Sequence, residues 1–507
     1  MPRLPLLAGS RVAVVNAPDD AVLLRAPPPL DPITEVGTAV REALRYPLSG
    51  PPLAALVRGG ARVTVVVEPP SLPLPGAPAD PRQDALAAIL AELERLGVPG
   101  RKQMILVAGG LSRRAGQREL EALLRPAQAR DFHGTVAVHD CETPSLHLLG
   151  ERQATPLRVS PHLVDTDLVV VVSAAETVLD GGPAALLQAC APETLRAAGA
   201  DSLLETRGSP GWDLAVALER LLTQRVPVMG VSLVLDHPRA TGRLRGWPHD
   251  PEVAEWIARS SARHLLNVLP ALTRRRILQG LPRELRATAA FAGPPSVAHA
   301  EALLRGIALR GVRLERPLDA VVIPLPWRSS HHPREPLNPL TAATIGLGLV
   351  LRLWRDAFPV ADGGTAVLVH RFTPTFGHGA GVPYRALFQS LQNGLEQEGL
   401  AEAEELAAHD RRAVAAYRAG RAPHPLLPYA EWASCAPALS RLGRVIVAGC
   451  RDAGAARRLG FVPSHSTATA LEMAYGVAEG RARVGFLLAP PYAPLLVGES
   501  GAGPPDV

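Results

Sequence analysis

Short apolar runs alternate with amphipathic segments along most of the chain. The run at residues 168–172 is continuous and rich in valine, which is typical of a strand covered on both faces. Similar runs at 61–68 and 103–108 flank the segment 81–96, whose leucines and isoleucine fall on one helical stripe. Strands that alternate with helices in this way predict βαβ units and a largely parallel sheet. The predicted fold class is therefore α/β.

The same patterns divide the chain into two predicted α/β domains. The first contains further strands at 11–15, 135–138, 226–235 and 286–291, and helices at 33–44, 118–124, 212–223, 251–279 and 296–309. The second contains strands at 319–325, 365–370, 444–448 and 484–488, and helices at 340–354, within 384–420, at 453–459 and at 468–478. We expect domains at 1–314 and 315–495, an interdomain cleft, and a disordered tail at 496–507.

Composition restricts the class of protein. The chain has 507 residues, of which 47% are hydrophobic and 20% charged, as in globular proteins. No apolar run approaches the roughly 18–20 residues of a membrane helix, and the N-terminal segment leads directly into a predicted strand, so neither a membrane span nor a signal peptide is expected. The four cysteines form no CxxC pair, which fits a cytoplasmic protein without a zinc site. The net charge of +5 and basic runs without interleaved aromatics, such as Arg274–Arg276, argue against nucleic-acid binding.

The chain contains a single lysine, Lys102. Chemistry that needs a lysine nucleophile or tether must use Lys102 or be absent. Lys102 precedes the predicted strand 103–108, whereas ligands of open α/β sheets bind at the carboxyl ends of strands. We therefore interpret Lys102 as a solvated turn residue.

The turn after strand 168–172 is the main candidate for a binding site. A polar segment from Glu176 to Gly182 follows the strand, and a small-residue helical segment begins at Pro183. A buried strand that leads through a Gly-Gly turn into a helix is a common ligand position in open α/β sheets. The alternative is a tight turn that binds nothing.

Several segments in order resemble the nickel-pincer-dependent lactate racemase family, in a longer and divergent branch. They include VAGGLSRRAGQREL at 107–120, LDGGPAALL at 179–187, FAGPPSVAHAEALLRG at 291–306 and NPLTAATIGLGLVLRLWRD at 338–356. The resemblance implies two α/β domains with a site between them. It also implies a nickel-pincer nucleotide tethered to a lysine and ligated by a histidine. Two further histidines would move a proton at the α-carbon of a 2-hydroxy acid.

Matched position by position, most of the residues that the resemblance implies are missing. Ala184 stands where the family has its tethering lysine, and Ala174 stands where it has a histidine. Ser112 replaces the histidine of a His-Arg pair, and no histidine follows the region of Thr194. The Asp-x-x-Arg loop corresponds to the segment from Glu68, which has no arginine, and a lysine expected at 337–343 is absent. The matched positions that remain are Asp180, Gly181, Gly182, Arg113 and Asn338.

This pattern predicts a racemase fold without the family's catalytic apparatus, and therefore no nickel-pincer cofactor and no metal. Serine and alanine cannot act as the base that proton transfer at carbon requires. The predicted function is the binding of a small carboxylate or of a partner protein in the cleft. Two alternatives stay open: a subunit that supports an intact homologue by oligomerisation, and an active 2-hydroxy-acid racemase or epimerase with a rebuilt site. The candidate residues for a rebuilt site are the histidines His331, His332, His139 and His370.

Overall fold

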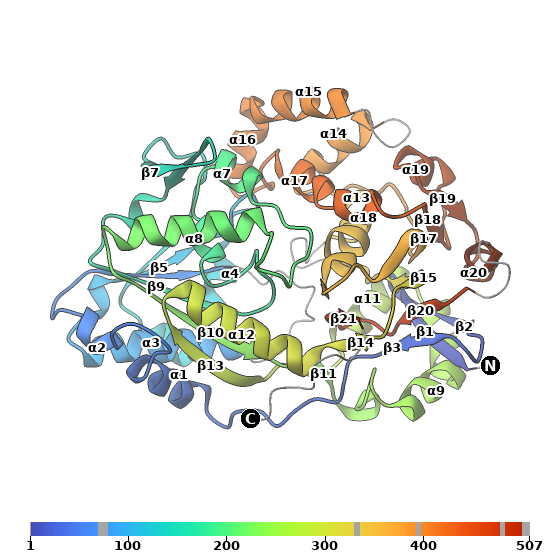
Figure 1. Cartoon of the computed structure of the whole chain (residues 1–507), viewed down its shortest axis with the longest axis horizontal. Coiled ribbons are helices and arrows are strands. Elements are labelled where there is room, and N and C mark those ends of the chain that lie inside the picture. Colours follow the sequence, from blue (N-terminus) through green and yellow to red (C-terminus); the bar gives the residue numbers. More distant parts are fainter. Residues whose placement is uncertain (1, 69–79, 329–334, 392–396, 477–481, 499–507) are drawn as a thin grey trace.

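The computed structural model describes residues 2–68, 80–328, 335–391, 397–476 and 482–498. Two six-stranded sheets form the centres of two lobes, which lie at the left and right of Figure 1. The predicted α/β class with largely parallel sheets is confirmed. No described helix is long and apolar enough to cross a membrane.

The first sheet has the strand order β13–β10–β9–β4–β5–β6, and β13 is the one antiparallel member. Its strands are β4 (Val63–Val67), β5 (Gln103–Val107), β6 (Thr135–Val138), β9 (Leu168–Ala174), β10 (Val228–Leu235) and β13 (Ala287–Gly293). Alternate residues of β9 enter two different cores. Val170 packs with helices α1 (Val36–Arg45) and α3 (Pro81–Arg95), and Val169 packs with α6 (Ala184–Leu187) and α8 (Pro210–Thr223). This two-sided burial explains the continuous valine run.

The second sheet has the order β19–β18–β17–β15–β20–β3 and is parallel throughout. Its strands are β3 (Val22–Leu24), β15 (Leu318–Pro324), β17 (Val360–Val369), β18 (Arg444–Ala448), β19 (Val462–Ser464) and β20 (Val484–Leu487). The hairpin of β1 (Arg3–Ala8) and β2 (Arg11–Asn16) shares a core with this sheet. The strand predicted at 11–15 therefore exists, but it and β3 lie with the second sheet. The domain limits 1–314 and 315–495 stay predictions.

Two segments differ from the prediction. The helix expected at 340–354 consists of α13 (Pro339–Ala343), a π-helical segment at Thr344–Leu349, a 3-10 turn at Val350–Arg352 and the start of β16 (Trp354–Arg355). It is buried as predicted, but close packing of Gly346 on Leu368 and of Gly348 on Ser434 accompanies the irregular winding. The expected tail begins inside strand β21 (Leu495–Val497), and residues 499–507 lie outside the described residues.

The remaining elements complete the two lobes. They are α2 (Leu53–Leu56), α4 (Gln117–Glu121), α5 (Pro126–Asp131), the unpredicted hairpin β7 (His147–Arg152) and β8 (Thr155–Val159), α7 (Pro192–Ala197), β11 (Arg239–Ala240), α9 (Pro251–Arg259), α10 (Ser261–Val268), α11 (Ala271–Gln279), β12 (Arg283–Glu284), α12 (Pro295–Arg310), β14 (Val312–Leu314), α14 (Val382–Ser390), α15 (Gln397–Ala408), α16 (Arg411–Arg418), α17 (Leu427–Ala433), α18 (Ala436–Leu439), α19 (Ala453–Arg458) and α20 (Thr467–Tyr475), with 3-10 turns at Gly100–Lys102, Pro161–Leu163 and Gly242–Leu244.

Glu219 of α8 should make the stability of the first lobe depend on pH. Its carboxylate accepts hydrogen bonds from the backbone N–H and the hydroxyl of Ser296, in the first turn of α12, at 2.9 and 3.1 Å. Burial raises the pKa of Glu219 from 4.5 to about 7. The folded state therefore favours the protonated acid, and its contribution to stability is present below pH 4.5 and is lost as the pH rises through about 7.

Glu219→Gln should therefore stabilise the protein at pH 8, by about 1–3 kcal/mol, and change little at pH 4.5. The amide retains one acceptor for Ser296 and carries no charge. Urea unfolding at both pH values measures the difference. A variant that is less stable than the wild type at pH 8 contradicts this role of Glu219. Glu252→Gln, at an exposed position in α9, is the control.

Candidate functional site

A cavity of about 690 Å³ lies between the two lobes. The first lobe contributes Asp180, Gln188 and the segment 195–203, and the second contributes Thr344–Arg352 and residues 430–440. The exposed surface of the cavity is mainly apolar, with several leucines and alanines and a few charged groups in its wall. A largely apolar pocket with a few polar groups, placed between domains, is the usual form of a small-molecule site.

Arg352 is the buried cation of this cavity. Its guanidinium donates to the backbone carbonyls of Gly348 and Asp201, at 3.0 and 3.4 Å, and to that of Ala200. These bonds use three of the five N–H groups of an arginine. Burial lowers the pKa of Arg352 to about 10, which still leaves it charged at neutral pH, and the nearby carboxylates of Asp201 and Asp180 oppose that shift. Arg352 therefore combines a structural role between the lobes with capacity to bind an anion.

Asp180 is held in a fixed turn at the wall of the cavity. The hydroxyl of Thr177 donates to Oδ2 of Asp180 at 2.7 Å, and the N–H of Gly182 donates to Oγ of Ser173 at 2.9 Å. Gly181 and Gly182 both have positive φ, at +89° and +53°. These hydrogen bonds hold the turn after β9 against its own strand.

The two glycines are required because His299 of α12 packs directly against the turn. A Cβ at Gly182 would lie 2.3 Å from the Cβ of His299, and one at Gly181 would lie 2.5 Å from its Cε1. His299 Nε2 is 2.9 Å from the carbonyl of Thr177, and its Nδ1 is 3.4 Å from Oγ of Ser232. Burial lowers the pKa of His299 to about 4, so the ring is neutral and donates from Nε2. A protein side chain thus explains the glycines of this motif.

A group of buried charges lies behind the turn, at the carboxyl edge of the first sheet. Glu68 follows β4, and burial raises its pKa well above the usual value, with Asp180 and Glu176 adding to the effect. Arg82 binds both carboxylate oxygens of Asp80 and lies 4.0 Å from Oε1 of Glu176.

The positions that would hold a nickel-pincer nucleotide do not fit it. Ala184 is fully buried in the core of the first lobe, and Ala174 is also buried. Lys102 is exposed in the 3-10 turn at the amino end of β5, at the opposite edge of the sheet from the Asp180 turn. No group of three or more histidine, cysteine, aspartate or glutamate residues suited to a metal ion occurs in the part of the chain that the structure describes. At these two matched positions the side chains therefore offer neither a lysine tether nor a histidine.

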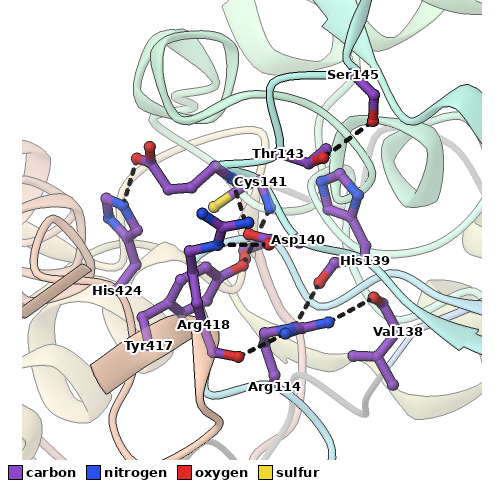
Figure 2. A network of polar contacts seen from close by, with 12 residues as sticks. Arg114, Val138, His139, Asp140, Cys141, Thr143, Ser145, Tyr417, Arg418 and His424 are labelled. Carbon is purple, nitrogen blue, oxygen red and sulfur yellow. Dashed lines mark hydrogen bonds and ion pairs between the residues drawn. The ribbon is translucent and has the colours of Figure 1, made fainter. Parts of the chain in front are cut away.

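A network of polar contacts joins the second lobe to the first near the ends of β5 and β6 (Figure 2). We call this network the clasp; it includes Arg114 and Asp140 of the first lobe and Arg418 of the second. Arg114 donates to the carbonyls of Val138, His139 and Arg418, at 3.1, 3.3 and 2.6 Å. Arg418 in turn binds the carboxylate of Asp140 at 2.9 Å. These contacts join α16 to the loops where the sheet ends.

Two more contacts extend the clasp. The hydroxyl of Tyr417 lies 3.2 Å from the carbonyl of Gly110 and 3.3 Å from the N–H of Cys141, and both are within hydrogen-bonding range. Nε2 of the buried His424 is 2.9 Å from Oε1 of Glu142. Buried polar groups that bond across the lobes fix one relative position of the lobes.

Replacing Arg114 should loosen the clasp. Arg114→Met keeps most of the side-chain length but leaves three carbonyls without their donor, so we expect a loss of about 2 kcal/mol in the free energy of unfolding. We also expect faster proteolysis within residues 411–424, measured by mass spectrometry of the fragments. Arg118→Met, at an exposed position in α4, is the control. Equal cleavage in both variants would contradict this role.

The other predicted site residues, Arg113 and Asn338, make contacts that stabilise the fold. Arg113 forms an ion pair with Glu119 and donates to the carbonyl of Gly420 at 3.3 Å. Asn338 caps α13, where its side chain accepts from the N–H of Thr341 at 3.0 Å. The retained motif residues thus have clear roles in folding, and a role in binding stays a prediction.

The two candidate histidines that the structure describes, His139 and His370, do not line the cavity. His139 is buried, and its Nε2 lies 3.0 Å from the carbonyl of Cys190. His370 is buried beside Phe372, whose N–H donates to its Nδ1. Burial lowers the pKa of both rings to about 4. His331 and His332 lie outside the described residues.

Sequence reasoning missed Arg352 and Tyr417. The hydrophobic pattern places Arg352 within an apolar helix, whereas in the structure it ends a 3-10 turn and lines the cavity. A lone arginine in a long buried apolar segment is a signal that could have identified it, because such a charge needs partners. No comparable signal marks Tyr417.

These features agree with the comparisons with known proteins. Residues 9–191 match the lactate racemase N-terminal domain. The structure is similar to that of the lactate racemase apoprotein from Thermoanaerobacterium thermosaccharolyticum, with a TM-score of 0.62 and 15% identity over 98% of this chain and 100% of that chain. It is also similar to a protein from Thermotoga maritima, with a TM-score of 0.50 and 12% identity over 93% and 100% of the two chains. No curated protein sequence matches the chain.

The resemblance inferred from the sequence motifs is therefore confirmed, and the likeness in fold extends beyond the lactate racemase N-terminal domain to nearly the whole chain. At these levels of identity the solved structures establish the fold, and the function must be argued from the residues.

Proposed function

We propose that this chain is a lactate-racemase-like protein that has lost the nickel-pincer chemistry and binds a small 2-hydroxy carboxylate between its lobes. The observation that carries the proposal is the combination of Arg352 and Asp180 in an apolar interdomain cavity, with buried alanine at the tether position 184.

The two charged groups have complementary tasks. Arg352 retains N–H donors beyond those bound to backbone carbonyls, and arginine recognises carboxylates through paired N–H groups. The carboxylate of Asp180 can accept a hydrogen bond from the hydroxyl of the ligand. Leu179, Leu187 and Leu195 supply apolar contact for the rest of a small molecule.

The lining of this cavity contains no histidine among the described residues, and its acids lack a paired base for proton transfer at carbon. This supports binding without turnover. In this proposal the protein acts in the cytoplasm as a binding protein or as an accessory subunit.

Thermal shift and calorimetry with D-lactate, L-lactate and lactamide test the proposal. We expect both lactate enantiomers to raise the melting temperature and lactamide to have no effect, because the amide lacks the charge that Arg352 binds. Asp180→Asn should weaken the binding of lactate more than the binding of propionate, because propionate lacks the hydroxyl group. Equal shifts with lactate and lactamide, or no shift with any of them at millimolar concentration, would overturn the proposal.

A further inference from the structure

Six arginines from five separate segments converge at the carboxyl edge of the second sheet. They follow β15, β17 and β18, begin β2 or lie on α11, and we call them the arginine cluster: Arg11, Arg274, Arg275, Arg328, Arg371 and Arg451. The carboxyl ends of parallel strands are where open α/β sheets bind ligands. None of these residues lines the interdomain cavity.

Direct contacts bring the segments together. The N–H of Arg451 donates to the carbonyl of Arg371 at 2.8 Å, which joins the exits of β17 and β18. Nε of Arg274 donates to Oγ of Ser10 at 3.3 Å, next to Arg11 in the hairpin turn. Arg274 also donates to the carbonyl of Leu269. The backbone positions of the cluster are therefore fixed by the fold.

An aromatic side chain completes the arrangement. The guanidinium groups of Arg275 and Arg328 lie 5.5 and 5.1 Å from the ring centroid of Trp327. The sequence shows basic residues at 274–276 without neighbouring aromatics, but the exit of β15 brings Trp327 beside them. A guanidinium group that stacks on an aromatic face can still bind a planar or tetrahedral anion through its N–H edge.

Five members of the cluster have no acidic partner in the part of the chain that the structure describes. Among the described residues, Arg11, Arg274, Arg275, Arg371 and Arg451 form no ion pair with an aspartate or glutamate. The Nε atoms of Arg11 and Arg275 are buried and have no hydrogen-bond partner in the described part of the chain. The charged groups that influence the pKa of Arg274 and of Arg371 are all arginines.

Like charges repel, so gathering them in a fold costs stability unless an anion neutralises them. Burial, with the charges of Arg11, Arg371 and Arg275, lowers the pKa of Arg274. Burial, with the charges of Arg451 and Arg11, lowers the pKa of Arg371. Guanidinium groups still stay protonated at neutral pH, so the cluster holds its positive charge.

We infer that the arginine cluster is a second binding site, which takes a small molecule bearing a phosphate or pyrophosphate group. Arginine matches the geometry of phosphate with paired N–H donors, and several arginines suit more than one negative charge. The site is independent of the carboxylate site proposed between the lobes.

Calorimetric titration of the full chain with pyrophosphate and inorganic phosphate, with ionic strength held constant by KCl, tests the inference. We expect pyrophosphate to bind more tightly than phosphate. Arg451→Gln, at an exposed position, should weaken pyrophosphate binding at least ten-fold, and Arg371→Gln should do the same. Arg225→Gln, exposed on the first lobe, is the matched control and should bind as the wild type does.

A second readout follows from the repulsion within the cluster. Without ligand and at low salt, Arg371→Gln and Arg451→Gln should melt at a higher temperature than the wild type. Addition of pyrophosphate should raise the melting temperature of these variants less than that of the wild type. Unchanged pyrophosphate affinity in both variants would overturn the inference. So would a pyrophosphate-induced rise in the melting temperature of the wild type that KCl alone reproduces at the same ionic strength. Tighter binding of a DNA duplex than of pyrophosphate, lost in the same variants, would contradict a small-molecule site.

Discussion

Gly182→Ala is expected to destabilise the protein by at least about 3 kcal/mol. The new Cβ would lie 2.3 Å from the Cβ of His299, and φ of +53° is unfavourable for alanine. Because the nearest atom is a Cβ, no rotation of the histidine side chain relieves the clash. Urea unfolding followed by circular dichroism measures the loss.

Gly208→Ala separates the clash from the backbone strain. Gly208 has φ of +73°, and a Cβ there would meet nothing within 4 Å. This control should cost only about 1 kcal/mol, which is the strain of a positive φ. If both variants lose the same stability, His299 does not explain the Gly-Gly turn, and a role of these glycines toward a ligand regains support.

Ala184→Lys is also expected to lower the free energy of unfolding strongly. It restores the residue type that the lactate racemase resemblance places there, but the methyl group of Ala184 is fully buried in the core beneath β9. A lysine in this position needs space that the core lacks and loses the solvation of its charge, so we expect a loss of about 4 kcal/mol or more at pH 7.

The pH dependence identifies the cause of that loss. Burial lowers the pKa of a lysine, so the penalty should grow as the pH falls from about 10 and should be smaller at pH 9.5 than at pH 6. Ala197→Lys, at an exposed position in α7, should change stability little at either pH. A stable Ala184→Lys protein would mean that the space for a tethered cofactor persists, which would contradict the proposed loss of the cofactor site.

The sequence predicts every strand of the first sheet, because each is a short apolar run between clear turn signals. In the second sheet it misses the short strands β3 and β19. It predicts α3 almost to the residue, since Asp80 caps the helix and Gly97 adopts φ of +88° after it. The hairpin β7–β8 was not predicted, and neither was the packing of the strand predicted at 11–15 against the second sheet, because contacts between distant segments leave no local pattern.

The candidate site was less accessible to sequence analysis. Asp180 and its glycines were identified from the motif, but the packing of His299 under them depends on a helix more than a hundred residues away. The arginine cluster was missed for the same reason. Its members come from five segments, and Trp327 joins them only in the fold.

Whether the chain has lost the nickel-pincer chemistry is decided by intact-mass and metal analysis of the protein co-expressed with a complete biosynthesis system for that cofactor. We predict an unmodified mass, no stoichiometric nickel and no lactate racemisation, because no lysine or histidine stands at the matched positions Ala184 and Ala174. A mass increase equal to the cofactor, together with bound nickel and turnover of lactate, would contradict the proposed function.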